Sequence, residues 1–188
     1  KGEGAAVIYD TAQESFTSRY THETVALAFA LTEEAIEDNL YDTLSSRYTR
    51  ALARSMQQTK QVKAANVLNN AFSSSFVGGD GVELCSTAHP TVANVNLKNE
   101  LSTAADLNET SLDMGMISEG YVVNHYLTDT DAFFIKTDVP NGLKHFVRTA
   151  VSTSMEGDFE TGNVRYKARE RYSFGFSDWR GIFGSPGA

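Results

Sequence analysis

A stretch of forty residues without proline or glycine, from Glu33 to Phe72, most constrains how this chain can fold. Thr32 is a suitable N-cap, and the carboxylates that follow it lie where the helix dipole is positive. A single helix over 32–72 would be about 60 Å long, whereas a compact globule of this chain length has a diameter near about 40 Å. The sequence therefore predicts either an elongated molecule or a break in the polar stretch 57–61. Apolar residues at every fourth position mark one helix face, namely Ile36, Leu40, Leu44, Tyr48, Leu52 and Met56.

Residues 1–31, which precede this helix, have an extended and β-prone pattern. Val25, Leu27, Phe29 and Leu31 occupy alternate positions, as a half-buried strand requires. The pattern fits an ordinary hairpin at a sheet edge. It fits equally an arm that projects from the body and packs on a neighbour.

The clearest strand pattern lies near the C-terminus. Apolar or aromatic residues share its even positions, and its odd positions hold Arg165, Lys167, Arg169 and Arg171; the even set is Val164, Tyr166, Ala168, Tyr172, Phe174 and Phe176. One face should enter a core, while the basic face should meet an acidic surface, such as the carboxylate-rich helix start of this chain or of a neighbour. A turn is expected at 73–81, where two lobes would meet. Shorter strands are predicted around 121–123, 132–135 and 146–148.

Composition and charge exclude several classes of protein. The chain has 188 residues and a net charge of −8, with 24 acidic against 16 basic side chains. No apolar run approaches the roughly 20 residues that span a bilayer. The single Cys85 excludes an internal disulfide framework and a multi-cysteine zinc site. We expect a soluble, acidic, intracellular protein that is not a general nucleic-acid binder, although the basic strand face leaves a monomeric nucleic-acid-binding module open as an alternative.

Few residues form a pattern that points to catalysis. Cys85 and His89 are four positions apart, which allows a nucleophile and a base. A buried structural cysteine beside a turn histidine explains the same spacing. The four histidines are scattered, and none belongs to a His-Glu-x-x-His zinc motif. The sequence thus predicts no catalytic, cofactor-binding or metal-ligating residue, with a small Cys/His enzyme as the distant alternative.

Several segments together resemble major capsid (head) proteins of tailed bacteriophages, which share the Hong Kong-phage capsid fold. The resemblance runs through essentially the whole chain. Its most specific parts are the Ser-Thr-Ala-His-Pro phrase at 86–90 and the Asp-Trp-Arg-Gly phrase at 178–181. The other parts are the extended segment 25–29, the helix from Thr32, and the segments 80–85, 129–135 and 172–177.

The resemblance implies an α+β subunit with four parts. Residues 1–31 would form an extended loop that reaches over a neighbour, and 32–76 the long spine helix of a peripheral domain. Residues 77–138 would contribute to a truncated axial domain, and 139–188 would supply the C-terminal strands of the peripheral domain. The axial part is shorter than the family pattern, which suggests a seam in the sequence at Met114–Gly115.

The resemblance also implies a structural function without catalysis or cofactors. The chain would assemble with itself into pentamers and hexamers of an icosahedral shell, in a phage or prophage head that encloses double-stranded DNA. Further partners would be portal, scaffold or decoration proteins, with only non-specific contacts to DNA and none to membranes. The location would be the virion capsid, after assembly in the bacterial host cytoplasm. The nearest alternative is the shell protein of a bacterial nanocompartment on the same fold.

Overall fold

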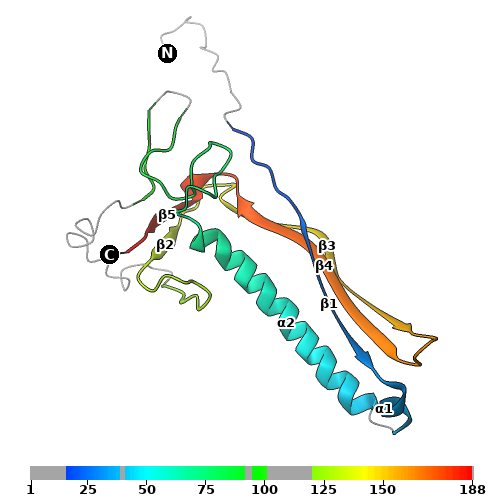
Figure 1. The fold of residues 1–188 in the computed structure, drawn as a ribbon. Helices are drawn as coiled ribbons and strands as arrows, with labels where there is room; N and C mark the ends of the chain where they lie inside the picture. The colour runs from blue at the N-terminus through cyan, green and yellow to red at the C-terminus, as the bar shows by residue number, and fades with distance from the viewer. Residues whose placement is uncertain (1–15, 39–40, 92–94, 101–119, 188) are drawn as a thin grey trace, which may run out of the picture.

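A computed structural model describes residues 16–38, 41–91, 95–100 and 120–187 of the chain. The long helix α2 lies alongside a three-stranded sheet, and a two-stranded sheet stands at one end of this pair (Figure 1). The described part is therefore an elongated α+β structure with few layers. Its elements are β1 (Glu23–Leu31), α1 (Glu33–Glu37), α2 (Tyr41–Asn69), β2 (Phe133–Lys136), β3 (Leu143–Gly157), β4 (Val164–Phe176), the 3-10 helix η2 (Trp179–Gly181) and β5 (Ile182–Ser185).

The large sheet is antiparallel in the order β1-β4-β3, so β4 is its central strand. Phe29 lies opposite Tyr166, and Leu27 lies opposite Ala168. Directly opposed residues share a face, and Ala168 packs with Leu52 of α2, so this face is the one that α2 covers. The odd residues of β4 point away from α2. The predicted alternation of β4 is confirmed.

The predicted long helix is present but differs in its boundaries. The N-cap prediction is confirmed, because the Thr32 hydroxyl accepts a hydrogen bond from the backbone N–H of Ala35 at 3.4 Å. The first helix ends after one turn at Glu37, and α2 begins at Tyr41. Neither a single helix over 32–72 nor a break at 57–61 is therefore correct. The 29 residues of α2 span about 44 Å at 1.5 Å per residue.

Other predicted elements have mixed outcomes. Residues 23–31 form an edge strand of the chain's own sheet, so the sheet-edge interpretation describes this part of segment 1–31. The predicted strands at 132–135 and 146–148 correspond to β2 and to part of β3, whereas 121–123 form no strand. The suggested seam at Met114–Gly115 lies outside the described residues. The four-part division of the chain stays a prediction.

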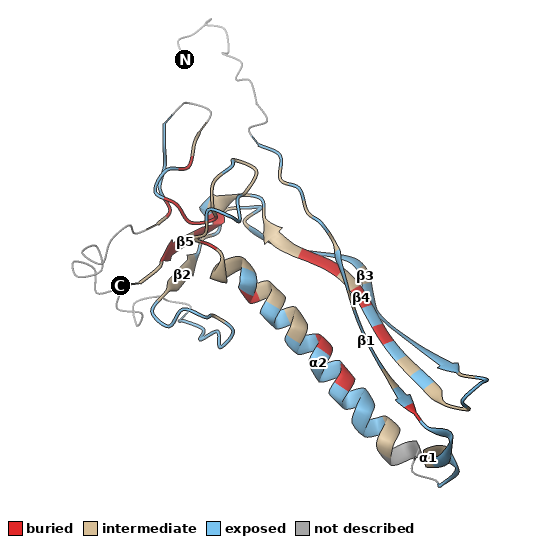
Figure 2. Cartoon of the chain, in the orientation of Figure 1, coloured by how far each residue is buried: buried red, intermediate tan, exposed pale blue. Residues whose placement is uncertain are grey.

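The core of the described structure consists of two small clusters. One joins α2 to the large sheet through Leu52, Met56 and Ala168. The other, at the opposite end, contains Ala71, Leu84, Cys85 and Ile182 and packs against the pair β2-β5. Figure 2 shows buried residues along β4, as single bands on α2, and in the loops and β5 at the other end, while β3 is largely exposed. The buried apolar side chains of the described residues are thus concentrated at two places along the rod.

Candidate assembly surfaces

Cys85 and His89 do not form a nucleophile–base pair. The thiol is fully buried, and burial, with a smaller effect from Glu100, raises its pKa to about 12. Both ring nitrogens of His89 contact other side chains: Nδ1 lies 2.7 Å from Oδ2 of Asp80, and Nε2 lies 3.0 Å from Oδ1 of Asn99. A protonated thiol is a poor nucleophile. Within the described ranges, no three His, Cys, Asp or Glu side chains could hold a metal ion, and no helix is long and apolar enough to cross a bilayer.

His89 instead belongs to a buried hydrogen-bonded cluster centred on Asn99. The Asn99 amide nitrogen faces three backbone carbonyl oxygens, those of Leu84, Trp179 and Ile182, at 2.8, 3.1 and 2.9 Å. This fixes the amide orientation, so Oδ1 accepts from His89 Nε2. His89 Nδ1 lies within hydrogen-bond distance of the Asp80 carboxyl, so the His89 ring bridges Asp80 and Asn99. The cluster joins the loop 80–100 to the C-terminal segment.

The Asp-Trp-Arg-Gly phrase completes this cluster. Trp179 stacks on the His89 ring at a centroid distance of 4.0 Å and an interplanar angle of 5°. Asp178 accepts hydrogen bonds from the Arg180 backbone and guanidinium, which lower the pKa of its carboxyl. The two phrases that are most specific in the sequence therefore contact each other, although 90 positions separate the two stacked residues along the chain.

Gly181 is required by a close approach of two backbone segments. A Cβ atom at this position would lie 2.6 Å from the Cα of Gly142. A Cβ atom at Gly142 would lie 3.0 Å from the Cα of Gly181. A separation of 2.6 Å is shorter than real Cβ atoms show. Backbone atoms cannot move aside as the end of a flexible side chain can. The backbones that precede β3 and follow β4 are therefore packed directly on each other here.

Replacing Gly181 with alanine is expected to lower the free energy of unfolding by about 1–3 kcal/mol through overpacking. Urea denaturation followed by circular dichroism measures this change. Gly157→Ala is the matched control, since nothing lies within 4 Å of its Cβ position, and its effect should stay within about 0.5 kcal/mol. Equal stability of the two variants would contradict the close-approach argument.

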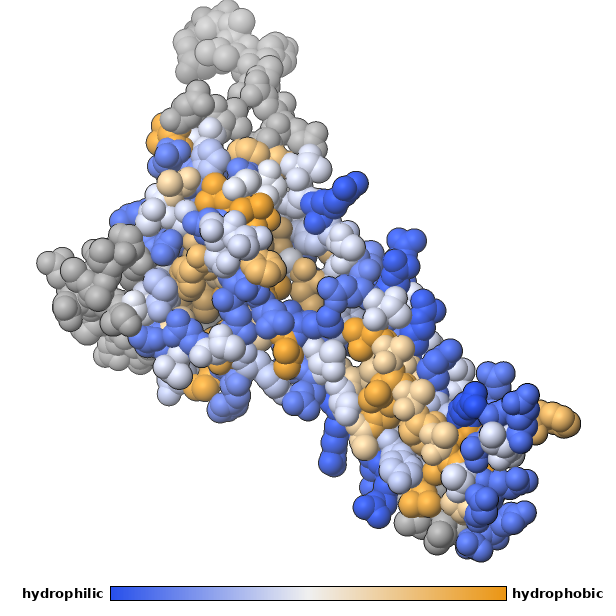
Figure 3. All heavy atoms as spheres, in the orientation of Figure 1, coloured by the Kyte–Doolittle hydropathy of each residue, from blue (hydrophilic) through white to orange (hydrophobic). Residues whose placement is uncertain are grey.

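The chain leaves much apolar surface uncovered. Eighteen large hydrophobic side chains are exposed, against ten hydrophobic residues in the core, among the residues that the structure describes. Figure 3 shows apolar side chains gathered over α2 and β1 toward the end of the molecule that carries α1. Leu27 of β1 and Tyr48 of α2 are 44% and 45% exposed. Contiguous exposed apolar surface is typical of sites that another protein covers.

The edge strand β3 is a second uncovered surface. Val147, Val151 and Met155 are all more than half exposed. The register of β3 with β4 shifts twice, between Val147 and Thr149 and between Thr149 and Ser152. Such bulges bend a strand and increase its twist, which protects an exposed edge from indiscriminate pairing. The bent edge of β3 can therefore pair with fewer other strands than a flat edge could.

The basic face of β4 is the third surface. Lys167 and Arg169 are exposed on the side of the sheet opposite α2. Their neighbours across the strands are small: Ala28 and Ala26 on β1, Ser154 and Ser152 on β3. Arg165 forms an ion pair with Asp158, whereas no described carboxylate pairs with Lys167, Arg169 or Arg171. We call these last three residues the basic stripe.

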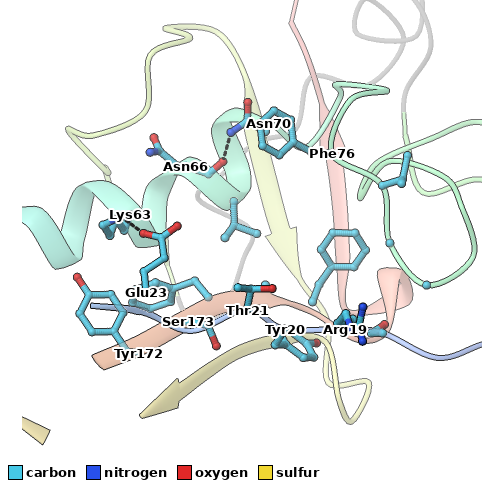
Figure 4. Close-up of a pocket in the computed structure, with 18 of the residues that line it drawn as sticks. Arg19, Tyr20, Thr21, Glu23, Lys63, Asn66, Asn70, Phe76, Tyr172 and Ser173 are labelled. Atoms are coloured by element: carbon cyan, nitrogen blue, oxygen red, sulfur yellow. Dashed lines mark hydrogen bonds and ion pairs between the residues drawn. The ribbon is translucent and has the colours of Figure 1, made fainter. Parts of the chain in front are cut away.

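An open pocket of about 650 Å³ lies between α2, the segment 17–23 and β4. In Figure 4, Lys63 and Glu23, which form an ion pair, reach toward each other at its side. The hydroxyl groups of Tyr172 and Ser173 line it and are buried without a hydrogen-bond partner among the described residues. Burial raises the pKa of Tyr172. The pocket is thus an open recess in the surface with a mixed polar and aromatic lining.

Comparisons with known proteins show the fold. No family model matches the sequence, and no curated protein is significantly similar to it. The capsid of bacteriophage JBD30 is similar in structure, with a TM-score of 0.60 and 16% identity over 98% of this chain and 55% of the capsid chain. The JBD30 procapsid gives a TM-score of 0.56 and 19% identity over 98% and 58%. This chain therefore spans a little over half of the chains that it matches, and the predicted phage capsid fold is confirmed.

Proposed function

We propose that this chain, which has the fold of a bacteriophage capsid protein, is a structural subunit of a closed protein shell. The observation that supports this most strongly is the likeness to the JBD30 capsid over 98% of the chain at a TM-score of 0.60. The sequence features that resemble head proteins point to the same function independently of that likeness.

The physical argument for a shell is the amount of surface that the rod leaves uncovered. One helix on one face of a sheet cannot bury the other face, the edge strand β3 or the seam between α2 and β1. Covering apolar surface is worth about 25 cal/mol per Å², so copies of the chain gain stability when they cover each other. Contacts between unlike surfaces that repeat by rotation close into rings, which are the capsomers of a shell.

The finer assignment follows the sequence resemblance. We assign α2 as the spine helix and β1, β3 and β4 as strands of the peripheral domain, with residues 77–138 in the axial part. The shell would be the icosahedral head of a tailed phage or prophage, built from pentamers and hexamers around double-stranded DNA. Portal, scaffold or decoration proteins would complete it in the host cytoplasm. No catalytic role is proposed.

Electron microscopy of the purified intact protein tests this proposal. We expect particles on the order of tens of nanometres across, because closed shells require many copies in repeated contacts. Size-exclusion chromatography should place the protein in the void volume. Protein that stays monomeric at all concentrations and salt conditions would overturn the proposal. Particles that hold an enzyme in place of nucleic acid would favour the nanocompartment alternative.

A further inference from the structure

One end of the rod is strongly acidic. Helix α1 and its C-cap contribute Glu33, Glu34, Glu37 and Asp38, all exposed. The end of β3 and the turn that follows it add three carboxylates, and this turn lies against α1, since a Cβ on Gly162 would overlap the Glu33 carboxylate. We call these seven carboxylates the acidic tip; the three are Glu156 at the end of β3 and Asp158 and Glu160 in the turn. Asp158 alone has an ion-pair partner, Arg165, among the described residues.

Most of the basic stripe lies away from the tip of its own chain. Leu31, just before α1, lies opposite Val164, at the start of β4. Arg169 is five residues further along this strand, about 17 Å away at 3.3–3.4 Å per residue, whereas Lys167 is nearer, at about 10 Å. Among the described residues no ion pair joins the stripe to the tip, and both surfaces are largely exposed, with Arg171 half-buried.

The two surfaces match in spacing as well as in sign. Alternate residues of a strand are about 6.7 Å apart, so Lys167, Arg169 and Arg171 form a line of evenly spaced cations. Residues three or four apart on a helix have Cβ atoms about 5–6 Å apart, which is the spacing of Glu34 from Glu37 and of Glu34 from Asp38. The small side chains that flank the stripe allow a helix to approach it closely.

We infer that the acidic tip of one copy docks on the basic stripe of a second copy. The inference rests on the proposed shell function, because it needs repeated contacts between copies. It joins two different surfaces, so each subunit offers its tip to one neighbour and its stripe to another, as ring closure requires. Charge complementarity of this kind fixes the register of an interface and speeds association.

Charge reversal tests the contact. Lys167→Glu with Arg169→Glu should raise the concentration needed for assembly at least about tenfold, because like charges then meet in the interface. Glu34→Lys with Glu37→Lys should do the same. The variant with all four changes should restore assembly toward the original level, since opposite charges face each other again. Light scattering measures assembly, and thermal melting by circular dichroism checks that each subunit is folded.

Arg50→Glu with Arg54→Glu is the matched control. Both arginines are exposed on α2, outside the stripe, and their reversal changes net charge by the same amount, so assembly should stay within about twofold if the contact is specific. The inference is overturned if folded stripe and tip variants assemble like the original, or if the fourfold variant does not recover. If the Lys167→Glu with Arg169→Glu variant forms normal shells that contain no nucleic acid, the inference is also overturned. The stripe would then bind nucleic acid and not a second copy of the chain. If the protein without substitutions forms no shell, both the proposed function and this contact are wrong.

Discussion

Asn99→Asp is expected to lower the free energy of unfolding by at least about 3 kcal/mol, because it replaces a buried amide N–H₂ donor with a charged oxygen that faces carbonyl oxygens. In the structure, the Asn99 amide nitrogen donates to the carbonyl oxygens of Leu84, Trp179 and Ile182, and the residue is 4% exposed. An aspartate oxygen at this place would face three oxygen atoms without a proton to share. The change in volume is negligible, so the loss reports the polar contacts and the buried charge together, with little contribution from packing.

Urea denaturation monitored by tryptophan fluorescence measures this loss. Trp179 is the only tryptophan of the chain and stacks on His89 within the same cluster. Burial raises the pKa of an aspartate at position 99, so its destabilising effect should grow as pH rises and shrink below about pH 4, where the carboxyl is protonated also in the unfolded chain. Asn96→Asp, at an exposed loop position, is the control. If the Asn99→Asp variant is as stable as the Asn96→Asp variant, the Asn99 amide does not hold the cluster together.

The sequence predicts those elements whose pattern is local. The alternation in β4 identified its core-facing side because neighbouring residues point to opposite faces, and Thr32 identified the start of α1 because a cap acts within one turn. The strand predicted at 121–123 is wrong: its residues favour β structure, but Val122 is 93% exposed and no described strand pairs with this segment. A strand needs a partner, and a local pattern does not provide one.

The buried cluster could not be predicted from sequence patterns. Asp80, His89 and Asn99 have no periodic spacing, and their meeting with Trp179 depends on the path of the chain through both sheets. The resemblance to head proteins singled out the phrases containing His89 and Trp179. Nothing in it indicated that these two rings stack, and Asn99, which makes the most contacts, was missed entirely.

The position of the helix break was wrong for a reason that the sequence does contain. The polar stretch 57–61 looked like an interruption of the apolar stripe, yet α2 continues through it. Lys60 in this stretch faces the sheet and reaches across to Glu170 of β4, with Nζ 2.6 Å from Oε2. Glu170 occupies an even, core-facing position of β4 and its side chain is 3% exposed. A carboxylate among core-facing residues signals a cation on the opposing element.

Lys60→Met is accordingly expected to cost about 3–5 kcal/mol of unfolding free energy, because it leaves the buried Glu170 carboxylate without its cation. Oε1 of Glu170 already lacks a hydrogen-bond partner among the described residues, and the nearby Tyr172 hydroxyl provides none. Methionine keeps the length of the lysine stem, so packing against the Tyr172 ring, 5.3 Å from Nζ, is largely retained. The loss is therefore electrostatic.

The double variant Lys60→Met with Glu170→Met should recover stability to within about 1 kcal/mol of the original or exceed it, since a buried ion pair contributes little beyond a well-packed apolar pair. Lys63→Met is the matched control one turn along α2: its partner Glu23 is 62% exposed at the side chain, so its removal should cost about 0–1 kcal/mol. Chemical denaturation of the four proteins gives the comparison. If Lys60→Met costs no more than Lys63→Met, the pair does not hold α2 against the sheet, and the small apolar cluster around Leu52 and Met56 must do so alone.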